Sequence, residues 1–183
     1  MIVRKAEAAD AEAIARIYVE SWRETYAGLI PDHVLIGMSP HHQTANWRGM
    51  IARRHDAERV MVAEGSAGIL GFGSYGPARH TGLAYKGEVF TLYVDPDRRG
   101  EGIGRSLLGA LLGALSDHGM ESALIWVLAE NPARFFYEAL GGRFIAVRED
   151  RMWGELLRQM AYGWHDLAAA TLGRAEHPAS RPQ

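Results

Sequence analysis

The sequence predicts a single-domain α/β protein organised around one strand–loop–helix–strand unit. Residues 88–94 (EVFTLYV) are rich in the β-branched and aromatic residues that favour strands. A loop of glycines and arginines follows, and leucines spaced by three, four and one then indicate a helix packed on a sheet over residues 103–115. Residues 123–128 (ALIWVL) form the near-continuous apolar run typical of a strand covered on both faces. We expect the two strands to pair in parallel, which makes a right-handed βαβ unit.

The composition is that of an ordinary globular protein. Of 183 residues, 48% are hydrophobic and 23% charged, and the formal net charge is −2. This balance provides no general attraction to nucleic acid or to an anionic membrane, so we expect neither as a partner. The N-terminus lacks a signal-type apolar segment, and no run approaches the ~18 apolar residues of a membrane span, so we expect a cytoplasmic protein. Cysteine is absent and the eight histidines show no ligand spacing, so no metal site is expected.

The chain before the hairpin predicts one strand and three helices. Residues 2–6 are expected to form a short strand, and Asp10 is placed to cap a first helix that ends near Gly28. Residues 31–37 and 40–54 predict a short and a longer helix, because each range begins with proline, which is favoured at the first helical position.

Four more strands and one short helix complete the predicted sheet. The strands are residues 60–63, 69–75, 143–149 and 156–166, of which the first two are joined as a hairpin. Asn131 is placed to cap a helix that begins at Pro132 and ends before Gly141. Large apolar residues become rare after residue 167, so we expect residues 168–183 to be a poorly ordered tail on a domain of residues 1–167.

The loop before the central helix has the features of an anion-binding site. Alternate glycines let the backbone approach a ligand closely, and the first N–H groups of the helix have no intrahelical partner. Three arginines add full positive charge. These residues are Arg98, Arg99, Gly100, Gly102, Gly104 and Arg105. A nucleoside-triphosphate loop would need a glycine in place of Arg99 and a lysine, so this alternative is rejected. A dinucleotide-binding loop would need a different spacing of glycines, so the match to it is weak.

The pattern that does fit is R-x-x-G-x-G, made by Arg99, Gly102 and Gly104. This segment resembles the acyl-CoA-binding motif of the GCN5-related N-acetyltransferase (GNAT) superfamily, whose loop wraps the pyrophosphate of coenzyme A. A second segment also resembles that superfamily, in the right order along the chain: Asn131, Phe136-Tyr137 and Leu140-Gly141. The aromatic residue that usually follows the Leu-Gly step is displaced to Phe144, which leaves the register of the next strand open by a residue or two.

The resemblance implies a mixed, mostly antiparallel central sheet of about seven strands flanked by helices, with a parallel βαβ acyl-CoA-binding core. It implies an N-acetyltransferase that binds acetyl-CoA as co-substrate. The backbone of Leu92 and Val94 would hold the acetyl carbonyl and the pantetheine arm like an added strand. The implied cofactor-binding residues are Leu92, Tyr93, Val94, Arg99, Gly100, Gly102, Ile103, Gly104, Arg105, Asn131 and Arg134.

Two residues are candidates for catalysis. Glu88, at the start of the central strand, could accept the proton of the amine directly or through water, because most of an amine is protonated at neutral pH. The alternative is a solvated carboxylate. Strand alternation places Glu88, Phe90, Leu92 and Val94 on one face. Tyr137 could donate a proton to the departing thiolate, and its alternative is core packing beside Phe136.

We therefore expect direct transfer to a primary amine without a covalent acyl-enzyme, because the chain has no cysteine and no serine in a nucleophile elbow. Three alternatives stay open: a different acyl-CoA or acceptor, a non-catalytic CoA-binding regulatory module, and a nucleotide-binding protein. Residues 22–36, 76–86 and 150–155 are expected to wall the acceptor pocket, although core packing is the alternative for the aromatic residues of the first range. The acceptor itself is not readable, and a homodimer through exposed strands or the tail is compatible with the sequence.

Overall fold

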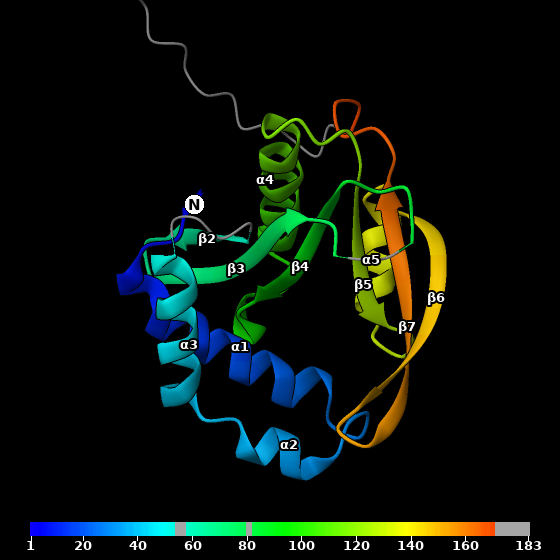
Figure 1. The fold of residues 1–183 in the computed structure, drawn as a ribbon. Helices are drawn as coiled ribbons and strands as arrows, with labels where there is room; N and C mark the ends of the chain where they lie inside the picture. Colours follow the sequence, from blue (N-terminus) through cyan, green and yellow to red (C-terminus); the bar gives the residue numbers. More distant parts are fainter. Residues whose placement is uncertain (54–57, 80–81, 171–183) are drawn as a thin grey trace, which may run out of the picture.

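The computed structural model describes residues 1–53, 58–79 and 82–170, which form one sheet with helices on both faces (Figure 1). The strands are β1 (Ile2–Lys5), β2 (Arg59–Gly65), β3 (Gly68–Pro77), β4 (Gly87–Val94), β5 (Ala123–Leu128), β6 (Arg143–Met152) and β7 (Glu155–Trp164). The helices are α1 (Ala11–Thr25), α2 (Asp32–Gly37), α3 (Pro40–Ala52), α4 (Ile103–Asp117) and α5 (Ala133–Ala139). Short 3-10 turns cover Ala8–Asp10 and Pro96–Arg98.

The seven strands lie in the order β1-β2-β3-β4-β5-β7-β6. Every neighbouring pair is antiparallel except β4 and β5, which are parallel and are joined through α4. The predicted mixed sheet with a parallel βαβ core is therefore confirmed. In the part of the chain that the structure describes, no helix is long and apolar enough to cross a membrane.

Apolar side chains fill both faces of the sheet. The predicted leucine stripe of α4 is confirmed, since Leu107, Leu108, Leu111, Leu112 and Leu115 are all buried. On the opposite face, α1 and α3 cover β2 and β3 through a second buried cluster. The sheet therefore has a core on each side, and β4 contacts both.

The parallel pairing of β4 with β5 is short. It covers only three residue pairs, from Gly87 opposite Ala123 to Val89 opposite Ile125. Beyond this point β4 continues along β3 and β5 continues along β7, so the two central strands diverge. The divergence opens the sheet at its middle, at the carboxyl ends of both parallel strands (Figure 1).

A β-bulge in β4 corrects the predicted alternation of that strand. Ser74 of β3 faces Thr91 and the next residue, Tyr75, faces Val89, so Phe90 is the extra residue. Glu88 consequently lies opposite Gly76 and on the face away from α4, because its neighbour Val89 packs with the leucines of α4. Leu92 and Val94 instead pack against α4, in the cluster that contains Leu107. The prediction that Glu88 shares a face with Leu92 and Val94 is wrong, because the bulge shifts the alternation by one residue.

The hairpin of the last two strands is tighter than predicted: β6 continues to Met152, three residues past its predicted end, and β7 begins at Glu155 and ends at Trp164, two residues before its predicted end. The expected turn over residues 151–154 is reduced to Trp153 and Gly154, and both have positive φ values, 52° and 87°. Two central residues with positive φ are typical of a type I′ hairpin turn, which lets the strands pair up to its edges. The uncertain register after the Leu-Gly step is explained by a second bulge, between Phe144 and Ala146.

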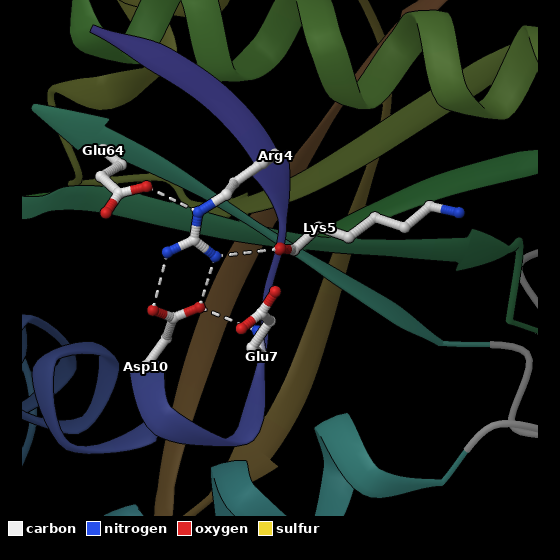
Figure 2. Close-up of polar contacts among 5 residues, drawn as sticks. All are labelled: Arg4, Lys5, Glu7, Asp10 and Glu64. Carbon is white, nitrogen blue, oxygen red and sulfur yellow. Dashed lines mark hydrogen bonds and ion pairs between the residues drawn. The ribbon is translucent and has the colours of Figure 1, made fainter.

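Asp10 is the N-cap residue of α1, as predicted, but its side chain makes no cap hydrogen bond to that helix. The Asp10 carboxylate accepts hydrogen bonds from the Arg4 guanidinium at 2.7 and 3.0 Å, and from the Glu7 N–H at 2.8 Å (Figure 2). Arg4 also donates to Glu64 at 2.7 Å. This cluster connects β1 to β2 and to the turn that leads into α1.

The other predicted boundaries differ by a few residues. The short helix begins at Asp32 rather than Pro31, and the longer one covers Pro40–Ala52, so that Arg54 of the predicted range lies outside the described residues. The first strand ends at Lys5. Of the expected tail, residues 168–170 form a turn next to the core, and residues 171–183 lie outside the described part.

Candidate active site

A cavity of about 620 Å³ occupies the gap between β4 and β5. Its walls come from the diverging parts of both strands, the loop before α4, the start of α5, the end of α1 and the tip of the β6–β7 hairpin. Ligand sites in open α/β sheets are expected outside the carboxyl ends of parallel strands, where this cavity lies. It is therefore the candidate active site.

One edge of β4 faces this cavity with polar backbone groups. Asp95 donates its N–H to Leu70 of β3 at 2.9 Å. Because backbone N–H groups alternate in direction along a strand, those of Leu92 and Val94 point the other way, toward the gap. The Val94 carbonyl accepts a 3.4 Å hydrogen bond from the Ser21 hydroxyl of α1. The structure thus leaves a strand edge open at the positions where sequence analysis expects the acetyl and pantetheine contacts.

The loop before α4 is shaped by its glycines and by Asp95. Gly100 and Gly102 have φ values of 83° and 79°, a left-handed conformation that favours glycine, and Gly102 is the N-cap residue of α4. Asp95 accepts from the N–H of Asp97 at 3.1 Å and forms an ion pair with Arg16 at 2.7 Å. The first turn of α4 therefore opens toward the cavity, with its N–H groups available to an anion.

Gly104 lies close to α5. It carries no positive φ, but a Cβ there would lie 3.2 Å from the Phe136 ring and 3.6 Å from Val94. Gly100, Gly102 and Gly104 all line the cavity. The glycines thus serve different needs, with two permitting the turn and the third permitting close approach between α4 and α5.

The arginines of the loop divide into two kinds. Arg99 and Arg105 line the cavity, and Arg99 also forms an exposed 2.7 Å ion pair with Glu24. Arg98 does not line the cavity and pairs with Glu101 at 2.9 Å. The side chain of Ile103 lies in the core, so the predicted cofactor contact of this residue would come from its backbone N–H at the start of α4. Two guanidinium groups therefore lie at the end of the cavity formed by α4, and that of Arg99 is paired with Glu24.

The start of α5 supplies Asn131 and Tyr137. The Asn131 side-chain oxygen accepts from the Ala133 N–H at 2.9 Å, so it caps α5 as predicted, although the helix begins one residue later than expected. Its amide nitrogen lies 3.5 Å from the Tyr26 hydroxyl. Arg134 does not line the cavity, and its guanidinium stacks on Phe135 at 4.2 Å. The structure thus brings Asn131 to the cavity and leaves Arg134 outside it.

Tyr137 is buried and lines the cavity. Burial raises the pKa of its hydroxyl well above 10, and the nearby Tyr26 hydroxyl acts in the same direction. Its ring packs against Phe136 and Trp164. A tyrosine in this setting is protonated at neutral pH and can therefore donate a hydrogen bond or a proton into the cavity.

Glu88 is buried but does not line the cavity. Its carboxylate accepts from the Arg79 N–H at 2.9 Å and forms a 3.0 Å ion pair with the Arg79 guanidinium. The same guanidinium lies 3.9 Å above the ring of Phe90, which does line the cavity. The Glu88 carboxylate therefore does not line the cavity, but it contacts Arg79, whose guanidinium packs on the cavity-lining ring of Phe90. Sequence analysis missed Arg79 because this contact depends on how the loop after β3 folds back.

Aromatic side chains from three elements line part of the cavity. Trp22 and Tyr26 come from the end of α1, and Trp153 comes from the tip of the β6–β7 hairpin. Both segments were among those expected to wall an acceptor pocket, and the structure brings them together. Tyr93 of β4 lines the cavity beside them, and its hydroxyl accepts from the Trp22 indole N–H at 2.9 Å. Within the described residues, no group of His, Cys, Asp or Glu side chains is arranged to hold a metal ion.

Comparison with known proteins agrees with this architecture. A family model described as the acetyltransferase (GNAT) domain matches residues 56–141. An uncharacterised N-acetyltransferase of Bacillus subtilis, YuaI, is 33% identical over 168 residues, which cover 91% of this chain and 94% of that protein.

Solved structures show the same fold. The ribosomal-protein-alanine N-acetyltransferase of Brucella melitensis is 25% identical with a TM-score of 0.66, and the match covers 90% of this chain and 99% of that one. YncA of Salmonella typhimurium, solved with its cofactor acetyl-CoA, is 23% identical with a TM-score of 0.66, and the match covers 99% of both chains. With a relative similar over nearly its whole length and a matching family model, this chain belongs to the GNAT family of N-acetyltransferases.

Proposed function

We propose that this protein transfers the acetyl group of acetyl-CoA directly to a primary amine, with both substrates bound in the cavity between β4 and β5. The observation that carries the proposal is the convergence of three features on one cavity. They are the open edge of β4, the glycine and arginine loop at the start of α4, and the buried hydroxyl of Tyr137. Each feature matches one chemical requirement of thioester aminolysis.

The cavity has the donor set that acetyl-CoA needs. The α4 N-terminus with Arg99 and Arg105 suits a pyrophosphate, because unpaired N–H groups and full positive charge both favour an anion. The edge of β4 suits the amides of a pantetheine arm, which can pair with the Leu92 and Val94 backbone as an added strand. Acetyl-CoA, when bound, supplies a thioester carbonyl that an amine can attack.

The residues of this chain supply the proton transfers and the charge stabilisation. The amine nitrogen forms a bond to the acetyl carbon, the carbon–sulfur bond breaks, the amine loses one proton and the thiolate gains one. The N–H groups directed into the gap from β4 stabilise negative charge on the carbonyl oxygen. Tyr137 donates to the sulfur, and Glu88 accepts the proton of the amine through water, because its carboxylate does not line the cavity.

The test is a coupled measurement of binding and turnover. Purified protein is titrated with acetyl-CoA by calorimetry, and release of free CoA thiol is then followed with a panel of amines. We expect acetyl-CoA binding that ATP and NAD do not displace, and thiol release that requires an amine and yields the N-acetylated product. Binding without amine-dependent release would support a non-catalytic CoA-binding module instead. Faster thiol release with a longer acyl-CoA than with acetyl-CoA would mean that the longer acyl-CoA is the preferred donor.

A further inference from the structure

We propose that the acceptor amine carries an aromatic or similarly bulky apolar group and no carboxylate, and that Trp22, Tyr26 and Trp153 recognise this group. These three residues are called the aromatic wall below. The inference rests on the proposed function for the identity of the site. It goes further by naming the class of acceptor and a specificity-determining residue, Trp153.

The geometry of the aromatic wall is well defined. The ring of Trp22 lies 4.9 Å from that of Tyr26 and 5.6 Å from that of Trp153, both in T-shaped arrangements. The indole N–H of Trp22 is fixed by its hydrogen bond to the Tyr93 hydroxyl. All three rings line the cavity. A site with fixed aromatic rings favours a flat or branched apolar group, which can form further edge-to-face and stacking contacts.

Trp153 occupies a backbone position that does not suit tryptophan. Its φ of 52° places it in the left-handed region, which is unfavourable for a residue with a side chain. Asparagine, aspartate or glycine is preferred at this position of a type I′ turn. The side chain is also 40% exposed, so burial does little to offset the strain. Backbone strain of this kind is often found at functional sites, and here it directs an indole ring onto Trp22.

The charges around the cavity exclude other acceptor classes. Among the described residues that line it, no aspartate or glutamate is present, and the cations are Arg99 and Arg105. Arg99 belongs to the loop before α4 and Arg105 to the first turn of that helix, where the phosphates are expected. Among the described residues that line the cavity, a carboxylate of an amino acid would therefore meet no cation beyond these two arginines, and a second ammonium of a polyamine would meet no anion. Gln159, which is buried and lines the cavity, already accepts two hydrogen bonds from Arg148, at 2.7 and 2.9 Å, and donates to the Met152 sulfur at 3.3 Å.

The test compares four probe amines that differ by one feature at a time. Phenethylamine has the aromatic body alone, phenylalanine adds a carboxylate, butylamine lacks the ring, and putrescine has a second ammonium. We expect kcat/KM for phenethylamine to exceed that of each other probe by about tenfold or more, which corresponds to about 1.4 kcal/mol of discrimination. Quenching of tryptophan fluorescence by each amine measures its binding independently of acetyl-CoA.

Variants assign the preference to the aromatic wall. Trp153→Asn places a favoured residue in the turn and removes the ring, so the fold should be retained while the KM for phenethylamine rises about tenfold and that for butylamine stays unchanged. Trp153→Phe should keep most of the preference and is informative even where the asparagine variant folds poorly. Leu156→Asn is the matched control, because Leu156 lies in the same hairpin, is 59% exposed and does not line the cavity.

Failure of this inference is distinguishable from failure of the proposed function. Equal or better acetylation of phenylalanine or putrescine would overturn the aromatic acceptor and leave the transferase proposal intact. A Trp153→Asn protein with an unchanged preference would remove Trp153 from recognition. If no amine is acetylated, the fluorescence titration still decides, because failure of phenethylamine to bind more tightly than the other three probes would overturn the inference.

Discussion

At the scale of single residues, Glu88 depends on its contact with Arg79. The Glu88 carboxylate is buried, and both hydrogen bonds from Arg79 fix its orientation beside Phe90. Glu88→Gln keeps an oxygen that can accept from the Arg79 N–H, so the fold should be retained. If Glu88 accepts the amine proton through water, kcat should fall about 10²–10⁴-fold near neutral pH, with little change in acetyl-CoA affinity.

A pH series identifies the cause of that loss. Raising the pH increases the fraction of neutral amine, so the activity of Glu88→Gln should partly recover. Glu121→Gln serves as the control, because Glu121 is an exposed carboxylate that precedes β5. Turnover that equals the wild type across the neutral range would assign proton removal to a different group.

Tyr137 makes a sharper prediction, because only its hydroxyl is at issue. No described residue forms a hydrogen bond with this hydroxyl. Tyr137→Phe should therefore change the unfolding free energy little. Turnover should fall about 10²-fold, and the loss should shrink with a thioester that releases a more acidic thiol. Since burial raises the pKa of Tyr137 well above 10, it should not cause a fall in rate at any pH below about 10.

Tyr162→Phe is the matched control for Tyr137. Tyr162 is also buried, its ring lies 6.3 Å from that of Tyr137, and it does not line the cavity. Its substitution should leave turnover unchanged. Full activity of Tyr137→Phe on acetyl-CoA would return Tyr137 to a packing role.

The Arg4–Asp10 pair predicts a pH-dependent stability. Hydrogen bonding to Arg4 holds the pKa of Asp10 below its usual 3.8 (Figure 2). A carboxyl whose pKa is lowered by folding stabilises the protein above its unfolded pKa, and this contribution is lost as pH falls through the folded value. Asp10→Asn should therefore lower the unfolding free energy by about 1–3 kcal/mol near neutral pH. Urea denaturation should show this difference shrinking at pH values below 3.8.

A surface pair provides the comparison for Asp10. Glu20 forms an ion pair with Arg16 in which both side chains are about half exposed, and such pairs contribute about 0–1 kcal/mol. Glu20→Gln should therefore have a small effect at every pH. A similar effect of the two substitutions would mean that the Arg4 cluster contributes no more than a surface contact.

At the scale of elements, the role of Gly102 in the loop before α4 can be compared with that of a second glycine, Gly119, at the other end of the helix. Gly102 and Gly119 flank α4, have φ values of 79° and 78°, and each has open space where a Cβ would be. Alanine at either position should cost the same conformational energy, about 1–2 kcal/mol. Only Gly102→Ala should also weaken acetyl-CoA binding, because only Gly102 lines the cavity. Thermal unfolding with and without acetyl-CoA measures both effects.

The outcome separates a ligand site from a turn. Equal destabilisation of both variants, with the ligand-induced shift lost only in Gly102→Ala, would support a phosphate site at this loop. Equal destabilisation with equal ligand-induced shifts would mean that Gly102 is required by the turn alone. Arg99→Ala should weaken binding in the same direction, and the difference from wild type should diminish at high ionic strength.

Sequence reasoning succeeded where one element carries its own pattern. The α4 stripe, the Asn131 cap and the β2–β3 hairpin are local features, and each was found within a few residues of its place. The bulge at Phe90 has no local signal, because it is defined by which β3 residues face β4. The extra residue Phe90 decides on which face of the sheet Glu88 lies. The surroundings of Glu88 could therefore not be predicted from the sequence.

At the scale of the whole molecule, the sequence predicted the order of the elements but not which distant segments meet around the gap between β4 and β5. The resemblance of two motifs implied a mixed sheet of about seven strands, and this is confirmed. The aromatic wall joins segments 22–26 and 153, which are far apart in the chain, so no spacing rule could pair them. The gap itself divides the sheet into one part ending at β4 and another containing β5, β7 and β6.

This division makes a prediction about unfolding. The two parts of the sheet share only three parallel residue pairs, and the proposed ligand would contact both across the gap. A ligand at one hundred times its Kd adds about 2.7 kcal/mol to stability, and each kcal/mol raises Tm by about 2–4 °C in a domain of this size. Acetyl-CoA should therefore raise Tm by about 5–10 °C. Both parts should show this shift together, because each is tied to the same bound molecule.

Site-specific tryptophans make the shift measurable in each part. Trp47 of α3 packs against Phe72 of β3, and Trp164 of β7 packs against Tyr137. Variants that retain only one of these two tryptophans therefore report the unfolding of one part of the sheet each. Coincident transitions, with and without acetyl-CoA, are expected for one cooperative unit. A shift confined to the Trp47 signal would mean that the ligand contacts the α4 loop without reaching α5. That result would contradict a cavity in which Tyr137 acts on the thioester sulfur.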